Sequence, residues 1–286
     1  MAEYISSMQN PAVKLLKSLH SKKGRYENGL FLVEGTRLCS EICPPWQTEL
    51  LIFSERFYEE NAESQTLKEA GAAAFEAERK ELIAGCPEAK VRILPEEVFA
   101  AVSDTQHPQG VLAAVRMRLF DLSVFTQKKN PFLVVLEDLQ DPGNAGTILR
   151  TADAAGADGI LCSKGTVDFY SPKTVRASMG SIFHLPVVQA ENIAEDLLEL
   201  RQHGVHLLAA HLQGSRPHFE ADYTGGCAIM IGNEGNGLTP EAAALADERV
   251  RIPQPGRAES LNASVAAGIL IYEALRQRTG GEISCI

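Results

Sequence analysis

A continuous apolar run followed by a turn and a helical segment indicates the fold class: Phe132-Leu133-Val134-Val135-Leu136-Glu137-Asp138-Leu139-Gln140-Asp141-Pro142-Gly143-Asn144-Ala145. Its first five residues have the length of a buried strand. The Pro-Gly turn leads to Asn144, which we expect to be the N-cap of a helix near Ala145 to Ala155. A buried strand followed by a helix is typical of a parallel sheet that is covered on both faces.

The same alternation continues to the C-terminal end of the sequence. We expect further strands at Gly159–Cys162, Leu185–Val188, His206–Ala210, Ala228–Ile231 and Val250–Ile252. We expect further helices at Ser171–Ser181, Ile193–Gln202, Thr239–Leu245 and Asn262–Arg278. Because ligands of such α/β sheets bind beyond the carboxyl ends of the strands, we expect the functional site in the loops there.

The N-terminal half of the chain is expected to be a second, smaller α/β domain, since 286 residues exceed the usual size of one core. Strands are expected at Phe31–Val33, Leu50–Phe53, Val91–Leu94 and Val111–Val115, and helices at Arg37–Cys43, Glu59–Ala70 and Pro95–Val102. We therefore divide the chain into an arm at 1–28, a small domain at 29–118, a linker at 119–130 and a C-terminal domain at 131–286.

The arm at 1–28 is basic, although the chain as a whole has a formal net charge of −10. Five Lys or Arg stand against one acid between Met1 and Arg25. Its apolar residues Val13, Leu15, Leu16 and Leu19 recur at helical spacing after Asn10-Pro11, which also fits a surface helix docked by that stripe. A net negative charge argues against a large nonspecific nucleic-acid footprint, whereas a local basic arm can still bind phosphate.

Three classes of protein are disfavoured by composition. The longest apolar runs have strand length and are far shorter than a membrane span. No apolar region of a secretory leader follows Met1 to Asn10, so we expect a cytoplasmic protein. The six cysteines and seven histidines form no supported metal-binding pattern, so we expect no metal and interpret the cysteines as buried reduced thiols.

Three segments depart from the local pattern directly after an expected strand. The first runs from Asp141 to Arg150 and places Arg150 inside the helix, six residues after Asn144. A capped helix with one solvated arginine would explain it equally well. The second, Gly232-Asn233-Glu234-Gly235-Asn236-Gly237-Leu238, matches neither the phosphate loop nor the dinucleotide fingerprint. It indicates either close approach of the backbone to a ligand or a plain tight turn, which would leave Glu234 without an evident role.

The third segment runs from Ile252 to Ile269. Two prolines and a glycine predict an irregular loop, after which Ser260 and Asn262 offer capping groups at the start of the last helix. Ala263, Ala266, Ala267 and Gly268 give that helix a face of small residues. A helix or a ligand can therefore come close to it.

Taken together and in this order, the three segments resemble the signature motifs of the SpoU (TrmH-like) family of RNA ribose 2′-O-methyltransferases, in the SPOUT class. The matching positions are Asn144 with Arg150, Glu234 in its glycine-rich loop, and Ser260-Leu261-Asn262 followed by Ser264. The N-terminal half resembles the substrate-binding domain of that family, which is similar to small RNA-binding ribosomal proteins. Phe31–Gly35 and His107–Val111 carry this likeness, and the arm is most similar to the ribosomal-RNA-modifying members.

The resemblance implies a C-terminal parallel-sheet domain with a trefoil knot and S-adenosyl-L-methionine as the methyl donor. It assigns cofactor binding to Gly232, Ile252 and Leu261, and the catalytic site to Arg150, Asn144, Glu234, Ser260 and Asn262. In the family the arginine comes from the second subunit of a homodimer. Because arginine stays protonated, we interpret Arg150 as an electrostatic positioner rather than a base, oriented with the ribose by the other four residues.

The substrate implied by the resemblance is structured RNA, with 23S ribosomal RNA as the leading hypothesis. Two alternatives stay open: a tRNA 2′-O-methyltransferase, which would share the chemistry, and a noncatalytic RNA-binding or ribosome-assembly protein that keeps the fold. The polar residues of all three segments are present, which argues against the noncatalytic alternative.

Overall fold

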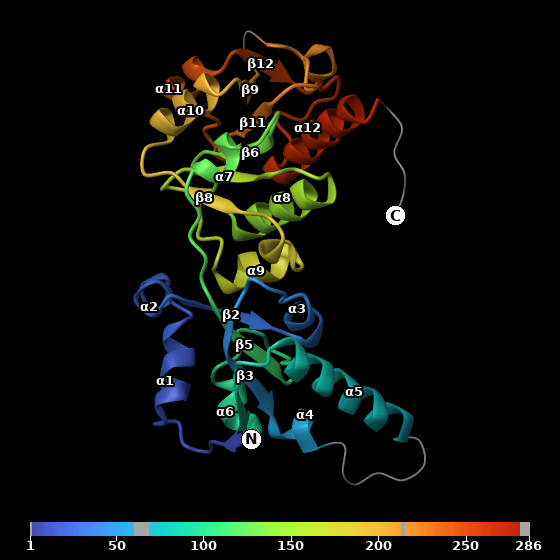
Figure 1. The fold of residues 1–286 in the computed structure, drawn as a ribbon. Helices are drawn as coiled ribbons and strands as arrows, with labels where there is room; N and C mark the ends of the chain where they lie inside the picture. The colour runs from blue at the N-terminus through green and yellow to red at the C-terminus, as the bar shows by residue number, and fades with distance from the viewer. Residues whose placement is uncertain (1, 60–68, 213–214, 281–286) are drawn as a thin grey trace. The chain divides into compact units, whose positions relative to one another are not determined.

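The computed structural model describes residues 2–59, 69–212 and 215–280, which form two compact units (Figure 1). The first unit contains residues 1–118 and 170–183, and the second contains residues 119–169 and 184–286. The chain passes from one unit to the other after residues 118, 169 and 183. The division of the sequence at residues 28, 118 and 130 stays a prediction.

The first unit is built on a five-stranded mixed sheet with the order β1-β4-β3-β5-β2. Its strands are β1 (Glu3–Tyr4), β2 (Leu30–Glu34), β3 (Thr48–Ser54), β4 (Lys90–Leu94) and β5 (Val111–Arg116). β5 is antiparallel to both β2 and β3, whereas β4 is parallel to β1 and β3. The helices of residues 1–118 are α1 (Pro11–Ser18), α2 (Lys22–Asn28), α3 (Thr36–Ser40), α4 (Glu55–Glu59), α5 (Glu69–Gly85) and α6 (Glu96–Ala100).

Helix α1 is part of the core of the first unit. Asn10 caps it by accepting a hydrogen bond from the backbone of Ala12 at 2.9 Å. Val13, Leu16 and Leu19 are fully buried and pack in one cluster with residues of β2, β3 and β5. The apolar stripe of the basic arm therefore docks α1 onto the sheet, and the lysines stay on the outer side.

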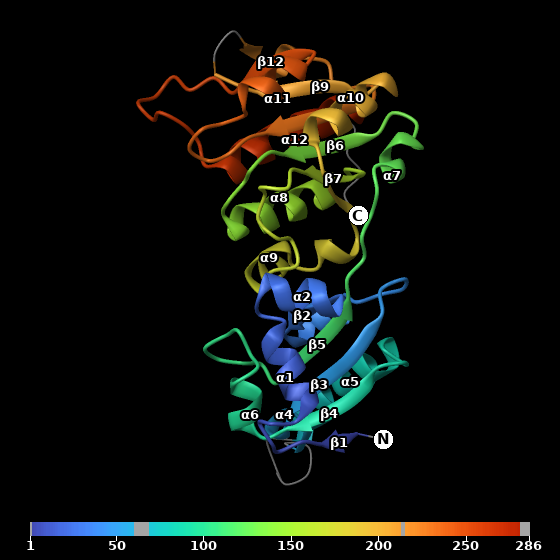
Figure 2. The ribbon, with the colours of Figure 1, turned by 90° about the vertical axis from the view of Figure 1, so that its left-hand side faces the viewer.

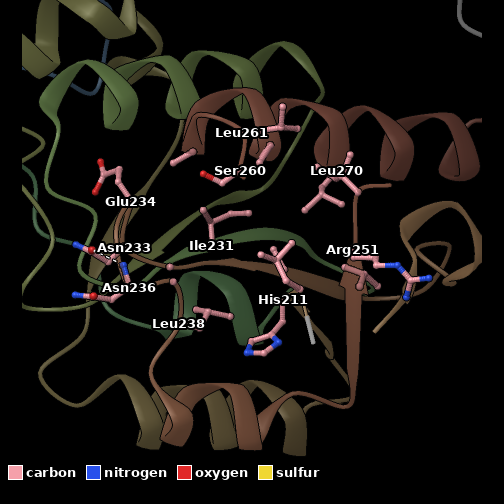
Figure 3. Close-up of a pocket in the computed structure, with 18 of the residues that line it drawn as sticks. His211, Ile231, Asn233, Glu234, Asn236, Leu238, Arg251, Ser260, Leu261 and Leu270 are labelled. Carbon is pink, nitrogen blue, oxygen red and sulfur yellow. Dashed lines mark hydrogen bonds between the residues drawn. The ribbon is translucent and has the colours of Figure 1, made fainter. Parts of the chain in front are cut away.

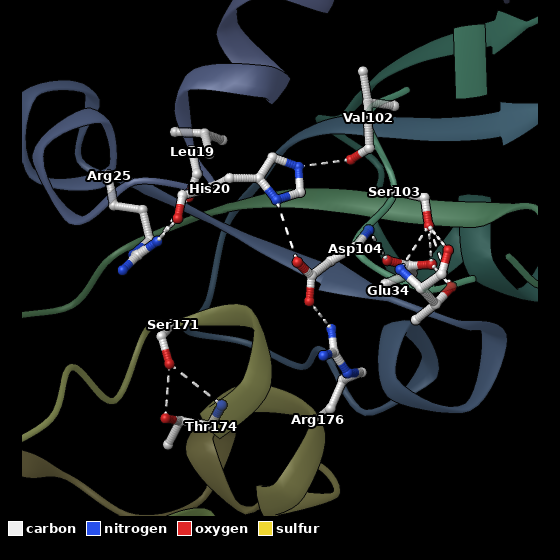
Figure 4. Close-up of polar contacts among 11 residues, drawn as sticks. Leu19, His20, Arg25, Glu34, Val102, Ser103, Asp104, Ser171, Thr174 and Arg176 are labelled. Atoms are coloured by element: carbon white, nitrogen blue, oxygen red, sulfur yellow. Dashed lines mark hydrogen bonds and ion pairs between the residues drawn. The ribbon is translucent and has the colours of Figure 1, made fainter. Parts of the chain in front are cut away.

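A short segment from the C-terminal half of the sequence completes this unit. It contains α9 (Pro172–Ser178) and the 3-10 turn η1 (Ser181–Phe183). Phe183 packs against Trp46 and Phe31, and its carbonyl oxygen accepts a hydrogen bond from Nε1 of Trp46 at 2.8 Å. Arg176 of α9 pairs with Asp104 at 2.6 Å (Figure 4). Aromatic packing and one ion pair thus hold the segment on the first unit.

The second unit is built on a seven-stranded sheet with the order β10-β12-β9-β11-β6-β7-β8, in which every neighbouring pair is parallel. This confirms the predicted α/β class. The strands are β6 (Phe132–Leu136), β7 (Gly159–Cys162), β8 (Val187–Gln189), β9 (His206–Ala210), β10 (Arg216–Pro217), β11 (Cys227–Ile231) and β12 (Glu248–Arg251). The helical elements are α7 (Ser123–Thr126), α8 (Pro142–Ala154), α10 (Ile193–Gln202), η2 (His218–Glu220), α11 (Pro240–Leu245) and α12 (Ala263–Arg278).

Helices cover both faces of this sheet. α10 and α11 lie on one face, and α8 and α12 lie on the other (Figure 1). Leu197 and Leu200 of α10 pack in one cluster with Leu133 and Val135 of β6. Phe125 of α7 is fully buried in the same cluster, so the segment 119–130, which we expected to be a linker, begins with an ordered part of the second unit.

Most strand and helix bounds differ from the expected ones by a few residues, but the long helix α5 (Glu69–Gly85) was not predicted, and neither were the shortest elements. β1, β10, α4, α7 and both 3-10 turns are too short to show a period in the sequence. The helix expected at Glu59–Ala70 falls mostly on residues outside the described ones. Of the described cysteines, Cys43 is exposed, so the interpretation of all cysteines as buried was wrong there. No described helix is both long and apolar enough to cross a membrane.

Candidate functional site

The sheet of the second unit brings the three unusual segments to one edge. The first follows β6, the second follows β11 and the third follows β12. β6 and β11 are neighbours with Leu136 paired to Ile231, and β12 lies one strand further on, beyond β9. Because the strands are parallel, their carboxyl ends meet at the same edge, and the loops after β6 and β12 lie on the same side in Figure 2.

The carboxylate of Glu234 binds the start of the first segment. It accepts hydrogen bonds from the backbone N–H groups of Gln140 and Asp141, each at 3.0 Å, and from Nδ2 of Asn144 at 3.1 Å. Burial raises the pKa of Glu234, but these three hydrogen bonds outweigh it, and the pKa lies below its ordinary value. Glu234 is therefore an ionised anchor that fixes the loop after β6.

Asn144 is not the N-cap of α8, which corrects the prediction from the sequence. The cap is Asp141, whose side chain accepts a hydrogen bond from the backbone of Asn144 at 2.8 Å. Pro142 takes the first helical position, where its missing N–H has no consequence. The Asn144 side chain is buried and points to other partners.

These partners join all three segments. Asn144 donates to Glu234 through Nδ2, and its Oδ1 accepts a hydrogen bond from Nδ2 of Asn262 at 3.0 Å. The Oδ1 atom of Asn262 in turn accepts from the backbone of Ser264 at 2.9 Å and caps α12. The hydrogen-bond chain Glu234–Asn144–Asn262 is thus the physical link between three loops that lie far apart in the sequence.

A cavity of about 430 Å³ lies beside this chain. Its walls include the predicted residues Gly232, Glu234, Ile252, Ser260 and Leu261. In Figure 3, Leu261 and Leu270 lie on one side of the cavity, His211 and Leu238 lie on the opposite side, and Ile231 lies between them. Asn144, Asn262 and Arg150 do not line it. Its volume and the aliphatic half of its walls suit a small ligand with an apolar part.

Gly232 is required by the loop itself. A Cβ atom at this position would overlap the backbone of Gly237 and Leu238. Of the two explanations that the sequence left open for this loop, a ligand close to the backbone or a tight turn, the turn is the immediate reason for Gly232. Gly237 has a φ of 69°, in the left-handed region that favours glycine.

Asn233 shapes the same loop and was missed as a functional residue. Its Oδ1 accepts hydrogen bonds from the backbone N–H groups of Gly235 and Asn236 at 2.9 and 3.1 Å. Its Nδ2 donates to the carbonyl of Asp138 at 2.8 Å, which ties the loop to the end of β6. The sequence signal was an asparagine before a glycine-rich turn, a common position for such local hydrogen bonds.

Arg150 stands apart from the hydrogen-bond chain. It lies six residues after Asn144 on α8, which is about 9 Å along the helix axis and on a different face. Its side chain is exposed and has no hydrogen bond or ion pair with the residues that the structure describes. Arg150 is therefore an exposed cation outside the assembled site, able to bind an anion.

No metal centre is evident in the described parts of the chain. They contain no group of three or more His, Cys, Asp or Glu residues arranged to hold an ion.

Gln254, a further residue on the cavity wall, has a buried Oε1 atom without a hydrogen-bond partner among the described residues.

The first unit presents a separate polar and basic surface. The segments Phe31–Gly35 and His107–Val111 are adjacent, because the backbone N–H of Gly35 donates to the carbonyl of Val111 at 3.0 Å. The Glu34 carboxylate binds the loop before β5 through Ser103 at 2.5 Å and the backbone of Asp104 at 2.9 Å (Figure 4). The exposed lysines of α1 and α2 are Lys14, Lys17, Lys22 and Lys23. These cations suit a phosphate-bearing partner.

Two family models match the chain. Residues 131–272 match the model described as the SpoU rRNA Methylase family. Residues 10–113 match the model described as the MRM3-like substrate binding domain. The first match spans all three segments of the site, and the second spans most of the sheet of the first unit.

Characterised relatives and solved structures agree with these models. The 23S rRNA (guanosine(2553)-2′-O)-methyltransferase RlmP of Bacillus subtilis is 34% identical over 270 residues, which is 94% of this chain and 97% of the relative. The 23S rRNA (uridine(2479)-2′-O)-methyltransferase of Streptomyces viridochromogenes is 34% identical over 71% of this chain and 72% of its own. The structure of an AdoMet-bound rRNA methyltransferase from Sinorhizobium meliloti superposes with a TM-score of 0.81 at 33% identity, covering 96% of this chain and 98% of that one.

Proposed function

Since this chain belongs to the SpoU rRNA methylase family, we infer that it methylates a ribose 2′-hydroxyl of ribosomal RNA with S-adenosylmethionine as the methyl donor. The observation that carries this inference is the hydrogen-bond chain Glu234–Asn144–Asn262. It holds three loops together at the edge of the sheet and beside a cavity of suitable size.

The cavity fits the cofactor. Ile252 and Leu261 are apolar walls for the adenine, and the tight loop after Gly232 provides backbone groups at the cavity edge. S-adenosylmethionine supplies an electrophilic methyl group on a positively charged sulfur. We propose Gly232, Ile252 and Leu261 as its binding residues, with Ser260 at the same wall.

We propose that Arg150 prepares the ribose. A ribose hydroxyl is a poor nucleophile at neutral pH and must lose its proton during the transfer. A guanidinium cannot take that proton, because it is already protonated. Arg150 instead binds the neighbouring phosphate and stabilises the negative charge that develops on the 2′-oxygen, while the proton passes to phosphate or water. Asn144, Glu234, Ser260 and Asn262 position the loops around it.

We propose that the active form is a homodimer in which Arg150 serves the cavity of the partner subunit. The inner side of α12 packs on its own unit, whereas Val265 and Tyr272 on that helix are each 49% exposed. These two residues are seven positions apart and lie on one face of α12, where they suit an apolar interface. The free guanidinium of Arg150 would then complete a site on the second copy.

Mixing two inactive variants tests the dimer and its shared site. One variant is Arg150→Ala, and the other is Ala266→Trp, which fills the cavity. If subunits exchange randomly, half of the dimers are mixed and each has one complete site, so we expect about a quarter of wild-type activity. No recovery in a mixture that exchanges subunits would show that Arg150 acts within its own subunit. A monomer in analytical ultracentrifugation would exclude the dimer.

The family likeness also leads us to propose a trefoil knot formed by the chain around the loops at 232–238 and 252–262. The substrate we propose is 23S ribosomal RNA, which both characterised relatives are named for, and the place of action is the cytoplasm. The basic outer side of α1 and α2 is the proposed RNA contact of the first unit.

Ribose-methylation mapping of total RNA from cells with and without the gene tests the substrate. We expect one or a few positions in 23S RNA to lose methylation. A position lost in tRNA would instead support the tRNA alternative. If no position changes and isothermal titration calorimetry shows no binding of S-adenosylmethionine, the noncatalytic alternative holds.

A further inference from the structure

Gln254 belongs to the wall of the cofactor cavity, but neither the motifs nor the mechanism give it a role. Its Oε1 atom is buried and accepts no hydrogen bond from any residue that the structure describes. An amide oxygen that loses water without gaining a donor destabilises the folded protein. A buried acceptor on the wall of a ligand cavity is therefore expected to find its donor on the ligand.

The side chain of Gln254 lies on the same side of its segment as Ile252. From Arg251 to Pro255 the residues alternate between exposed and half-buried, and Ile252 and Gln254 are the half-buried ones. This alternation is the pattern of an extended chain, in which residues two apart point to the same side. Both residues line the cavity, so Gln254 continues the wall that Ile252 begins.

The chemistry of the wall indicates which group of the cofactor faces Gln254. Ile252 and Leu261 provide the aliphatic surface that suits the flat face of adenine. An amide oxygen accepts from any N–H or O–H group of the cofactor, so the place of Gln254 decides which group it meets: it continues the wall that begins with Ile252, the wall we assign to adenine. The exocyclic amino group of adenine is neutral, lies at the edge of the ring and carries two N–H donors, which need acceptors when they are buried.

We propose that Gln254 is a specificity-determining residue whose Oε1 atom accepts a hydrogen bond from the N6 amino group of the cofactor's adenine. This inference rests on the proposed function only in taking S-adenosylmethionine as the ligand of the cavity. It assigns to one side chain the recognition of adenine over purines that carry a carbonyl group at the same ring position.

Isothermal titration calorimetry on the full chain tests the proposal without any activity measurement. The probes are S-adenosyl-L-homocysteine and S-inosyl-L-homocysteine, which differ at this ring position by an amino group against a carbonyl oxygen. We expect wild-type protein to bind the adenosyl compound about tenfold more tightly, because the inosyl compound places an acceptor against Oε1. Gln254→Met has a similar length and no acceptor, and it should reduce this preference to about threefold or less.

Gln254→Glu is the matched control, since a carboxyl group keeps an acceptor oxygen at the same place, and it should retain the preference for the adenosyl compound. A wild-type protein that binds both compounds equally would overturn the proposal without the use of any variant. An unchanged preference in Gln254→Met, with the thermal unfolding temperature unchanged, would overturn it as well. If wild-type protein binds neither compound, the cofactor assignment itself fails, which is a different result.

Discussion

Replacing Asn144 by aspartate tests the hydrogen-bond chain directly. The substitution keeps the size of the side chain and an acceptor toward Asn262. It removes the Nδ2 donor and places a second carboxylate about where Nδ2 lies, 3.1 Å from the Glu234 oxygen. Asn144→Ala is the matched control, since it removes both hydrogen bonds and adds no charge.

The structure allows a magnitude to be worked out. Two unit charges 3.1 Å apart repel by about 1 kcal/mol in water and about 5 kcal/mol at the effective dielectric of a protein surface. Because Glu234 is exposed and the two carboxylates can move apart, we take their repulsion to be about 2 kcal/mol. The lost hydrogen bond to a charged group adds about 1.5 kcal/mol. The amino end of α8 offsets about 0.5 kcal/mol by favouring a negative charge.

We therefore expect Asn144→Asp to lower the free energy of unfolding of the second unit by about 3 kcal/mol at pH 7. Asn144→Ala should lower it by about 2 kcal/mol, independently of pH. At pH 5 the two carboxyl groups of the aspartate variant share a proton, because two adjacent carboxylates raise one of their pKa values. The protonated group can donate to Glu234 as asparagine does, so the aspartate variant should then be the more stable of the two.

Urea unfolding at pH 7 and pH 5, followed by far-ultraviolet circular dichroism, measures which of the two variants is the more stable at each pH. The only tryptophan of the chain, Trp46, lies in the first unit. Its fluorescence therefore follows the unfolding of the first unit, which does not contain Asn144, and serves as an internal control. If the aspartate variant is the milder one at both pH values, Asn144 does not donate to Glu234. If Asn144→Ala leaves the free energy of unfolding unchanged, the hydrogen-bond chain Glu234–Asn144–Asn262 does not stabilise the site.

The remaining predictions concern single positions of the site. Arg150→Ala should lower kcat about a thousandfold and leave the Kd for S-adenosylmethionine unchanged. Arg150→Lys should restore only part of the rate. A rise in the Kd of Arg150→Ala would contradict a role of Arg150 outside the cavity. The lowered pKa of Glu234 means that ionised Glu234 stabilises the folded state above its unfolded pKa of about 4.3. The stability advantage of wild type over Glu234→Gln should therefore be present at pH 7 and shrink as the pH falls below about 4, and an advantage constant down to pH 3 would argue against this linkage. Asn262→Ser and Asn262→Ala both lose the hydrogen bond to Asn144, but serine keeps a cap for α12, so the alanine variant should cost about 1 kcal/mol more, as urea midpoints would show. Gly232→Ala should weaken cofactor binding in calorimetry about tenfold or more, because its methyl group displaces the loop backbone; unchanged binding would show that the loop can yield.

The parallel sheet of the second unit could be predicted because its information is local. A buried strand and an amphipathic helix each leave a period in a short window of residues, as between Phe132 and Ala155. The edge at which the loops after β6, β11 and β12 meet follows from the strands being parallel. The catalytic and cofactor-binding residues taken from the family likeness stay predictions, although the structure does bring Asn144, Glu234 and Asn262 together.

The partners of those residues could not be predicted, because they lie far apart in the sequence. Asn144 and Glu234 are 90 positions apart, and Asn144 and Asn262 are 118 apart. The residues around Asn144 in the sequence predicted that it is an N-cap, because asparagine is a good N-cap residue. Only the folded chain shows that Asp141 takes that position and that Asn144 is left to connect the three loops.

The sequence by itself determined the α/β class of the second unit, the basic helical start of the chain and the segments that carry the site. The tertiary structure alone decided that residues 170–183 belong to the first unit, that Gly232 is dictated by its own loop, and that Gln254 has an unsatisfied oxygen on the cavity wall. The physical reason is the range of the forces involved. Helix and strand periods arise from backbone geometry within a few residues, whereas steric exclusion and hydrogen-bond satisfaction depend on atoms that only folding brings together.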